Sequence, residues 1–396
     1  MIRHRLTILR VVVMAIIALV GVGISDVAWS RQSPATSAAI RTVSVGVNPM
    51  RVVADGPSGH VFVLNSGYGR DHNMSTLTML DARSGRILHT TALGQFSLNM
   101  GVDSATERVF VSDEMTSAVS VIDARTGTIL GTTPVGPSPI IAVAEQTGRV
   151  FVMVTAINKV YMLDARTGRI VRIIRVPRGA ESVVVDGPTK RVFISCDYST
   201  GLNTQHPILT MLDARTGTTL RTISGIAGQM LVNNRTGLLY QIGSGLIRVL
   251  DGHAGTLRRT IALAHLYGPI VMDERSGHLF VADAYSRAVS MLDGRSGRML
   301  ARAAVAPANG VADDMTVDTR SGHVLIAGGG KTVMLDGWSG RVLRTIAVSG
   351  LIGVDGRTGH AFLARAHEGR QINVAVGPLH FSVGSDAGDV SMIATM

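Results

Sequence analysis

The chain contains few of the residues on which several common protein chemistries depend. Cys196 is the only cysteine among 396 residues, which excludes an internal disulfide, a Cys-x-x-Cys redox pair and a covalently attached haem. Aromatic residues make up only 4% of the chain, a small stacking surface for a protein that binds single-stranded nucleic acid. Outside the N-terminal segment no apolar run keeps a helical period for more than one turn. These absences predict an all-β protein whose stability comes from packing.

The charge is strongly positive and comes almost entirely from arginine. The formal net charge is +10, and Lys159, Lys190 and Lys331 are the only lysines. Such a balance permits contact with anionic surfaces or polymers but says nothing about the fold. Arginine recurs in the turns described below, yet His253 and Trp338 occupy the same turn position in other repeats. This variation indicates solvated turn residues, so nucleic acid is not the favoured partner.

The N-terminus has the layout of a secretory signal peptide. Three arginines precede an apolar stretch from Val11 to Ile24, and Ala28 and Ser30 supply small residues for cleavage. The apolar stretch is shorter than the roughly 20 residues that a membrane span needs. We therefore expect a signal peptide over residues 1–30, a linker over 31–39 and one domain over 40–396. The alternative is an uncleaved anchor, the only membrane attachment that the sequence offers. Both place the protein outside the cytoplasm, either periplasmic, secreted or surface-attached.

One phrase recurs seven times: an apolar pair, Asp, two variable residues, usually Ser or Thr, and Gly. Its aspartates lie 38 to 49 residues apart, at Asp81, Asp123, Asp164, Asp213, Asp251, Asp293 and Asp336. A period of this length is typical of a solenoid or a propeller. Asp at the start of a tight turn accepts hydrogen bonds from the backbone ahead of it, and Gly adopts the left-handed conformation. The phrase therefore predicts structural turns and no catalytic residues.

The repeats predict a β-propeller of four-stranded blades. In the stretch from Ile140 to Pro177, four runs rich in β-branched residues alternate with turns. The first half of this unit occurs eight times, with turns that begin at Asp55, Asp103, Glu145, Asp186, Asn233, Asp273, Asp318 and Asp355. The eight first halves favour eight blades, and seven would result if a terminal unit packed outside the ring.

The ends of the chain suggest how the ring closes. Residues 40–45 look like a fourth strand without its blade, and residues 389–393 look like a third strand after which the chain stops. We therefore expect the N-terminal strand to complete the last blade beside residues 390–393. Such closure leaves no long edge strand open.

Residues 41–396 resemble the YVTN-type propeller repeat. Residues 118–127, which read Ala-Val-Ser-Val-Ile-Asp-Ala-Arg-Thr-Gly, and the later Val135-Gly136-Pro137-Ser138-Pro139 fit that pattern closely. The last unit departs from it, with Ile393-Ala394 in place of Leu-Asp. The resemblance implies a secreted, periplasmic or surface-attached propeller, usually a binding module, within the wider superfamily of lactonase-like and quinoprotein-like propellers.

The variable connections point to one face of the predicted ring. The turns between the first and second strands and between the third and fourth strands share one face and are uniform, whereas the other connections are long and individual. Function in such scaffolds concentrates on variable loops held by a rigid frame. The candidate ligand-binding residues on the loop-rich face are Asp71, His72, Glu181, His206, His265, Tyr267, Asp313 and His367. Their spacing matches no metal motif, so no metal site is predicted.

The sequence favours a binding module over an enzyme. It contains no Gly-x-Ser-x-Gly elbow, no His-Glu-x-x-His and no dinucleotide fingerprint before a helix. We therefore expect an extracytoplasmic, non-catalytic propeller without a cofactor that binds a protein, a polymer or a small molecule. The alternative is a lactonase-like or quinoprotein-like enzyme with its site at the mouth of the central channel.

Overall fold

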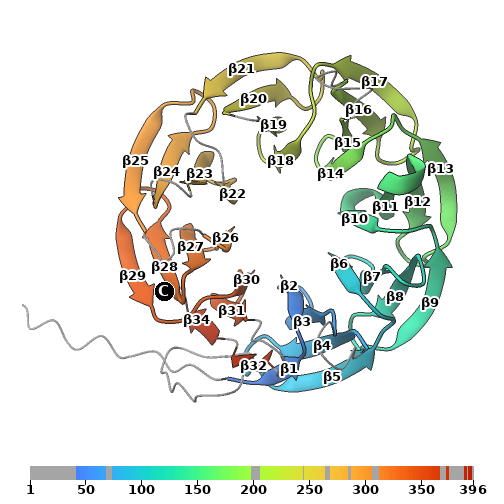
Figure 1. Cartoon of the computed structure of the whole chain (residues 1–396), viewed down its shortest axis with the longest axis horizontal. Coiled ribbons are helices and arrows are strands. Elements are labelled where there is room, and N and C mark those ends of the chain that lie inside the picture. The colour runs from blue at the N-terminus through green and yellow to red at the C-terminus, as the bar shows by residue number, and fades with distance from the viewer. Residues whose placement is uncertain are drawn as a thin grey trace, which may run out of the picture. The chain divides into compact units, whose positions relative to one another are not determined.

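The computed structural model describes residues 42–67, 74–197, 206–243, 245–263, 268–283, 287–305, 312–365, 372–373, 388–389 and 391–394. They belong to one compact unit, Ala38–Met396, whose sheets follow one another around a ring (Figure 1). The predicted signal peptide and linker lie outside the described residues and stay predictions. The structure confirms the all-β propeller.

Seven four-stranded antiparallel sheets, numbered here as blades in chain order, make up most of the ring. Blade 1 consists of β2 (Pro49–Asp55), β3 (His60–Asn65), β4 (Thr76–Asp81) and β5 (Ile87–Ala92); blade 2 of β6 (Ser97–Asp103), β7 (Arg108–Asp113), β8 (Ala118–Asp123) and β9 (Ile129–Pro134). Blade 3 consists of β10 (Pro139–Ala144), β11 (Arg149–Val154), β12 (Lys159–Asp164) and β13 (Ile170–Arg175); blade 4 of β14 (Ala180–Asp186), β15 (Arg191–Cys196), β16 (Ile208–Asp213) and β17 (Thr219–Ser224).

The remaining blades repeat this order. Blade 5 consists of β18 (Gln229–Asn233), β19 (Leu238–Gly243), β20 (Leu246–Asp251) and β21 (Leu257–Ala262); blade 6 of β22 (Ile270–Asp273), β23 (His278–Asp283), β24 (Ala288–Asp293) and β25 (Met299–Ala304); blade 7 of β26 (Asp314–Val317), β27 (His323–Gly328), β28 (Lys331–Asp336) and β29 (Val342–Ile346). The first strand of each blade lies nearest the centre of the ring and the fourth lies on its rim (Figure 1). Among the described residues only two 3₁₀-helices occur, η1 (Glu145–Thr147) and η2 (Thr155–Ile157), and no helix is long and apolar enough to cross a membrane.

A recurring aromatic residue fills the space between neighbouring blades. The third residue of the second strand is buried in every sheet and is aromatic in all but blade 7, where it is Leu325: Phe62, Phe110, Phe151, Phe193, Tyr240, Phe280 and Phe362 are each no more than 1% exposed. Each core cluster joins residues of adjacent sheets, as Phe151 of blade 3 and Val192 of blade 4 do. The propeller is therefore held together by apolar packing between blades.

The Asp phrase forms the turns that the sequence predicts. In blade 1, Oδ1 of Asp81 accepts hydrogen bonds from the backbone N–H and the hydroxyl of Ser84, at 2.7 and 2.6 Å. The amide of Gly85 then donates to the Asp81 carbonyl at 2.7 Å. The glycines of all seven phrases have φ between +64° and +74°, the region that side chains with a Cβ disfavour. The turns of these phrases, with those between first and second strands, form the face called here the turn face.

The eighth unit corrects the predicted blade count. The structure has seven four-stranded blades and not eight, because β30 (Leu351–Asp355), β31 (His360–Ala364) and β34 (Ser391–Ala394) form a three-stranded sheet, called here the last sheet. Its first strand, β30, contacts β2 of blade 1. On the turn face, Nδ1 of His360 donates a hydrogen bond to the carbonyl of Ala82 at 2.9 Å, and Nε of Arg357 donates to the carbonyl of Gly56 at 3.0 Å. The last sheet thus joins blade 1 directly.

The predicted closure by an N-terminal strand is not seen. The strand β1 (Ser44–Gly46) pairs with β32 (Ile372–Asn373), which runs parallel to β33 (Gly388–Asp389), and no described strand pairs with the outer edge of β34. The position of β1 has a physical reason. The carbonyl of Val45 accepts hydrogen bonds from Asn65 at 2.9 Å and from Thr78 at 2.5 Å, and the Val45 side chain is buried beside Val61 and Phe362. Blade 1 side chains therefore hold β1.

Candidate functional site

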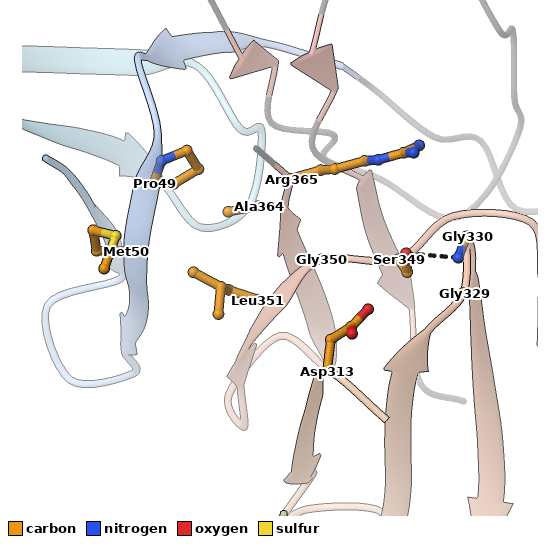
Figure 2. Close-up of a pocket in the computed structure, with 10 residues that line it drawn as sticks. All are labelled: Pro49, Met50, Asp313, Gly329, Gly330, Ser349, Gly350, Leu351, Ala364 and Arg365. Carbon is orange, nitrogen blue, oxygen red and sulfur yellow. Dashed lines mark hydrogen bonds between the residues drawn. The ribbon is translucent and has the colours of Figure 1, made fainter. Parts of the chain in front are cut away.

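The described residues form two pockets on the face opposite the turn face, called here the loop-rich face. The first, the seam pocket, has a volume of about 730 Å³ and lies where blade 7, the last sheet and blade 1 meet. Its lining residues are Pro49, Met50, Asp313, Gly329, Gly330, Ser349, Gly350, Leu351, Ala364 and Arg365 (Figure 2). The second, the blade-5 pocket, has a volume of about 510 Å³ and lies between blades 4 and 5. Both volumes are in the range of pockets that bind ligands.

The walls of the seam pocket come from the loop-rich ends of strands in three sheets. Met50 is the extra residue of a β-bulge, because β2 pairs Pro49 with Asn65 but Arg51 with Leu64. Bulges of this kind redirect a side chain at the edge of a sheet. Leu351 begins β30 and extends toward the side of the pocket where Met50 lies (Figure 2). The two half-buried apolar side chains thus form part of one concave surface.

Polar groups fix the far wall of the seam pocket. The hydroxyl of Ser349 accepts a hydrogen bond from the amide of Gly330 at 3.1 Å (Figure 2). The amide of Asp313 donates to the Ala327 carbonyl at 2.7 Å, and the Asp313 side chain, which lines the pocket, is exposed. Arg365 is also exposed, so the rim carries both signs of charge.

Asp314 connects blade 7 to the last sheet next to this wall. Its Oδ2 accepts a hydrogen bond from the amide of Ile352 at 2.7 Å. Burial raises the pKa of Asp314 above its ordinary value, and the neighbouring Asp313 acts in the same direction. The contact places the start of β30, and with it Leu351, beside blade 7.

The blade-5 pocket is more polar than the seam pocket. Its charged lining residues are Glu181, Asp197 and Arg248, which come from β14, from the residue after β15 and from β20. Glu181 is the extra residue of a second bulge, since β14 pairs Ala180 with Cys196 but Ser182 with Ser195. Its Oε1 accepts a hydrogen bond from the Ser195 hydroxyl at 3.1 Å.

The single thiol is not a nucleophile in this pocket. Cys196 is fully buried, and burial, followed by the charge of Glu181, raises its pKa to about 12. A thiol with this pKa stays protonated at neutral pH.

The structure separates the predicted site residues that it describes. Glu181 lines the blade-5 pocket and Asp313 lines the seam pocket, which are formed by different blades. His206 is exposed and directly precedes Pro207, which lines the blade-5 pocket. The other predicted residues lie outside the described residues: Asp71, His72, His265, Tyr267 and His367. Within the described part of the chain, no three His, Cys, Asp or Glu side chains come together as a metal site would require.

The apolar half of the seam pocket and the basic half of the blade-5 pocket were not predicted from the sequence. Met50 and Leu351 carry no signal in the sequence, because a bulge and a contact between distant blades place them. Arg248 and the buried Gln241 do carry a signal. They stand where the other repeats have different residue types, and an alignment of the repeats would have shown it.

The comparisons with known proteins agree with a propeller. A family model described as outer membrane protein assembly factor BamB matches residues 58–249, less than half of the chain. BamB from Moraxella catarrhalis is similar in structure, with a TM-score of 0.58, 15% identity, and coverage of 87% of this chain and 98% of that chain. Dihydro-heme d1 dehydrogenase NirN in complex with DHE is also similar, with a TM-score of 0.56, 13% identity, and coverage of 78% of each chain.

At these identities the likeness to both structures concerns the fold alone. No curated protein matches the chain. The matching family model is described as BamB and not as a YVTN-type repeat, so the comparisons support the β-propeller and a likeness to BamB without showing the YVTN-type family that the sequence resembles.

Proposed function

We propose that this protein is an extracytoplasmic, non-catalytic propeller that binds a partner protein through its loop-rich face. The seam pocket is the anchor of that contact, and the likeness to BamB favours a role in assembly at the cell envelope. The observation that carries the proposal is the pocket itself, a concave surface with Met50 and Leu351 inside and charged residues at the rim.

This arrangement suits an apolar side chain of a partner. Protein interfaces gain most of their binding energy from a few anchor residues buried in pockets, while a polar rim excludes water. Methionine adapts its shape to what it contacts, which is useful at a binding surface. Asp313 and Arg365 at the rim can pair with charges of either sign next to the anchor. The lining residues Gly329, Gly330 and Gly350 have no side chains that would narrow the pocket.

The test uses site-specific photo-crosslinking in cells. A photoreactive amino acid replaces Arg365, which is exposed at the rim of the seam pocket, or Trp338, which is 75% exposed on the turn face. We expect a discrete adduct with one protein from position 365 and none from position 338. A second substitution, Leu351→Arg, fills the pocket with a charged side chain and should abolish the adduct, whereas Trp338→Arg should leave it unchanged.

Two outcomes would contradict the proposal: no adduct from position 365, or an adduct that persists in the Leu351→Arg protein. Circular dichroism and the melting temperature of each purified variant establish that the propeller is intact.

The location has its own test. N-terminal sequencing of the protein recovered from the cell envelope or the medium should begin shortly after Ser30, as expected for a cleaved signal peptide. Recovery of the intact N-terminus in the membrane fraction would support the anchor instead, and recovery from the cytoplasm would contradict both.

A further inference from the structure

Blade 5 departs from the repeat at one pair of facing residues. In β19 and β20, Gln241 lies directly opposite Arg248. The equivalent pairs in the other sheets are Val63 with Thr78, Val111 with Ser120, Val152 with Tyr161, Ile194 with Thr210, Val281 with Ser290, Ile326 with Val333 and Leu363 with Ser391. An apolar residue thus occupies the position of Gln241 in every other sheet, and no other sheet has a charged residue at the position of Arg248.

A polar Gln241 at a position that is apolar in the other sheets lowers the stability unless its polar groups form hydrogen bonds. Gln241 is fully buried, and a buried amide without hydrogen bonds would destabilise the blade. Both ends of its side chain are bonded. Its Oε1 accepts a hydrogen bond from Nη1 of Arg248 at 2.8 Å, and its Nε2 donates to the carbonyl of Ala227. Gln241 therefore holds the guanidinium of Arg248 in a defined position in the blade-5 pocket.

Arg248 itself has unused capacity. A guanidinium has five N–H donors, and the bond to Gln241 uses one of them. Arg248 is half-buried, and in the described part of the chain no carboxylate lies within ion-pair distance of it. A positioned arginine without a counterion inside a pocket is suited to an anionic group of a ligand, because its planar fork matches a carboxylate.

The same pocket contains two carboxylates, Asp197 and Glu181, that receive few hydrogen bonds from the described residues. Oδ1 of Asp197 is buried and accepts no hydrogen bond from the described residues. Glu181 receives one hydrogen bond, from Ser195, and the bulge in β14 directs it into the pocket. The pocket therefore combines one guanidinium with two carboxylates, a lining whose formal charge is −1. A purely anionic ligand would leave the carboxylates unsatisfied and would be repelled by them.

We propose that the blade-5 pocket binds a free α-amino acid. The ligand carboxylate pairs with Arg248, and the ligand ammonium pairs with Asp197 and Glu181. The net charge of the lining favours a basic side chain, and a volume of about 510 Å³ accommodates one. This site is separate from the seam pocket and does not depend on the partner contact proposed above.

The test measures binding to the purified protein by isothermal titration calorimetry. The probes are L-lysine, Nα-acetyl-L-lysine, which lacks the α-ammonium, and L-lysine amide, which lacks the carboxylate. We expect L-lysine to bind, and each derivative to bind at least about tenfold more weakly, since each removes one charged contact. L-Alanine should bind more weakly than L-lysine but more tightly than its own acetylated form.

Matched variants locate the site. Arg248→Gln should weaken L-lysine binding at least about tenfold, and Glu181→Gln should weaken it by a smaller factor. Arg259→Gln is the control, because Arg259 lies in the same blade but is exposed on the outer strand β21, and this variant should bind like the wild type. Melting curves without ligand establish that each variant is folded.

Three results would overturn the proposal: no binding of L-lysine or L-alanine, equal binding by the Arg248→Gln protein, or equal binding of acetate and L-lysine. The last result would show an anion site only. A failure of the Arg365 cross-link would leave this proposal standing, and a failure of amino-acid binding would leave the partner contact standing.

Discussion

The recurring geometry of the turn face gives a quantitative prediction at Gly127. This glycine has φ +74°, and a Cβ at its position would lie 2.5 Å from Cδ2 and 2.9 Å from Cγ of His89 on the neighbouring blade. The substitution Gly127→Val therefore adds two costs. The left-handed backbone costs about 1–2 kcal/mol for a residue with a Cβ, and overpacking against His89 costs about 1–3 kcal/mol more.

Other sites in the same molecule separate these costs. Gly148 has φ +62° with no atom within 4 Å of an added Cβ. Gly148→Val should therefore lower the stability only by the backbone cost of about 1–2 kcal/mol. Gly131 lies in the exposed strand β9, without a positive φ and without a neighbour within 4 Å, so Gly131→Val should be nearly neutral. Arg125→Ala removes an exposed ion pair with Glu107 at 3.3 Å, whose contribution is about 0–1 kcal/mol.

The assay is thermal unfolding followed by circular dichroism, with the wild type and the four variants measured under one condition. The expected order of melting temperatures is Gly131→Val and Arg125→Ala near the wild type, then Gly148→Val, then Gly127→Val lowest. A shift of roughly 2 °C per kcal/mol is expected for a large domain. Equal melting temperatures for Gly127→Val and Arg125→Ala would refute the turn argument, and equality of the two positive-φ variants would refute the contact with His89.

Three further predictions concern the turns, the ring and the thiol. The hydrogen bond from the Ser84 side chain lowers the pKa of Asp81 below 3.8, and the pKa values of the six equivalent aspartates are lowered too. The stability that these carboxylates contribute is therefore complete above about pH 4 and is lost as the pH falls through their pKa values in the folded protein. An acid titration that shows no loss of melting temperature below pH 3.8 would contradict this prediction. His360→Ala removes a hydrogen bond between the last sheet and blade 1 and should destabilise the protein by about 1 kcal/mol. His253→Ala, in an exposed turn, should leave the stability unchanged. Equal unfolding midpoints of the two variants in urea would contradict this prediction. Cys196 should react with a thiol reagent at pH 8 only in denaturant, and labelling of the native protein would show that the thiol is accessible.

Local features of the fold were predictable from the sequence because they recur. The Asp phrase specifies its turn through hydrogen bonds between residues three apart, as in Asp81 and Ser84, and the glycine that follows has the expected positive φ. The alternation of short strands and turns likewise indicates a propeller. Each of these signals is contained within a few residues, and seven copies reinforce it.

The closure of the ring was not predictable in the same way. The sequence of residues 40–45 resembles a fourth strand, but its partner depends on contacts between the two ends of the chain. The hydrogen bonds from Asn65 and Thr78 to Val45 hold β1 on blade 1, and β1 pairs with β32. A count of sequence units therefore overestimated the number of four-stranded blades.

The candidate site was predictable in part. Glu181 and Asp313 were expected on the loop-rich face, and each lines a pocket there, because connections before a first strand lie at that face. Their separation into two pockets follows from blade order in three dimensions. Met50 was missed because a bulge is a property of strand pairing, whereas Gln241 is visible as the one polar residue at a position that is otherwise apolar.

The central claim, that a partner protein binds the loop-rich face at the seam pocket, is tested most directly by hydrogen–deuterium exchange. The protein is measured alone and in complex with the purified partner identified by the Arg365 cross-link. We predict slower exchange in the complex at the starts of β2 and β30, which carry Met50 and Leu351, and no change in the turns at Asp123 and Asp293. Slower exchange confined to those turns would place the partner on the turn face and contradict the account.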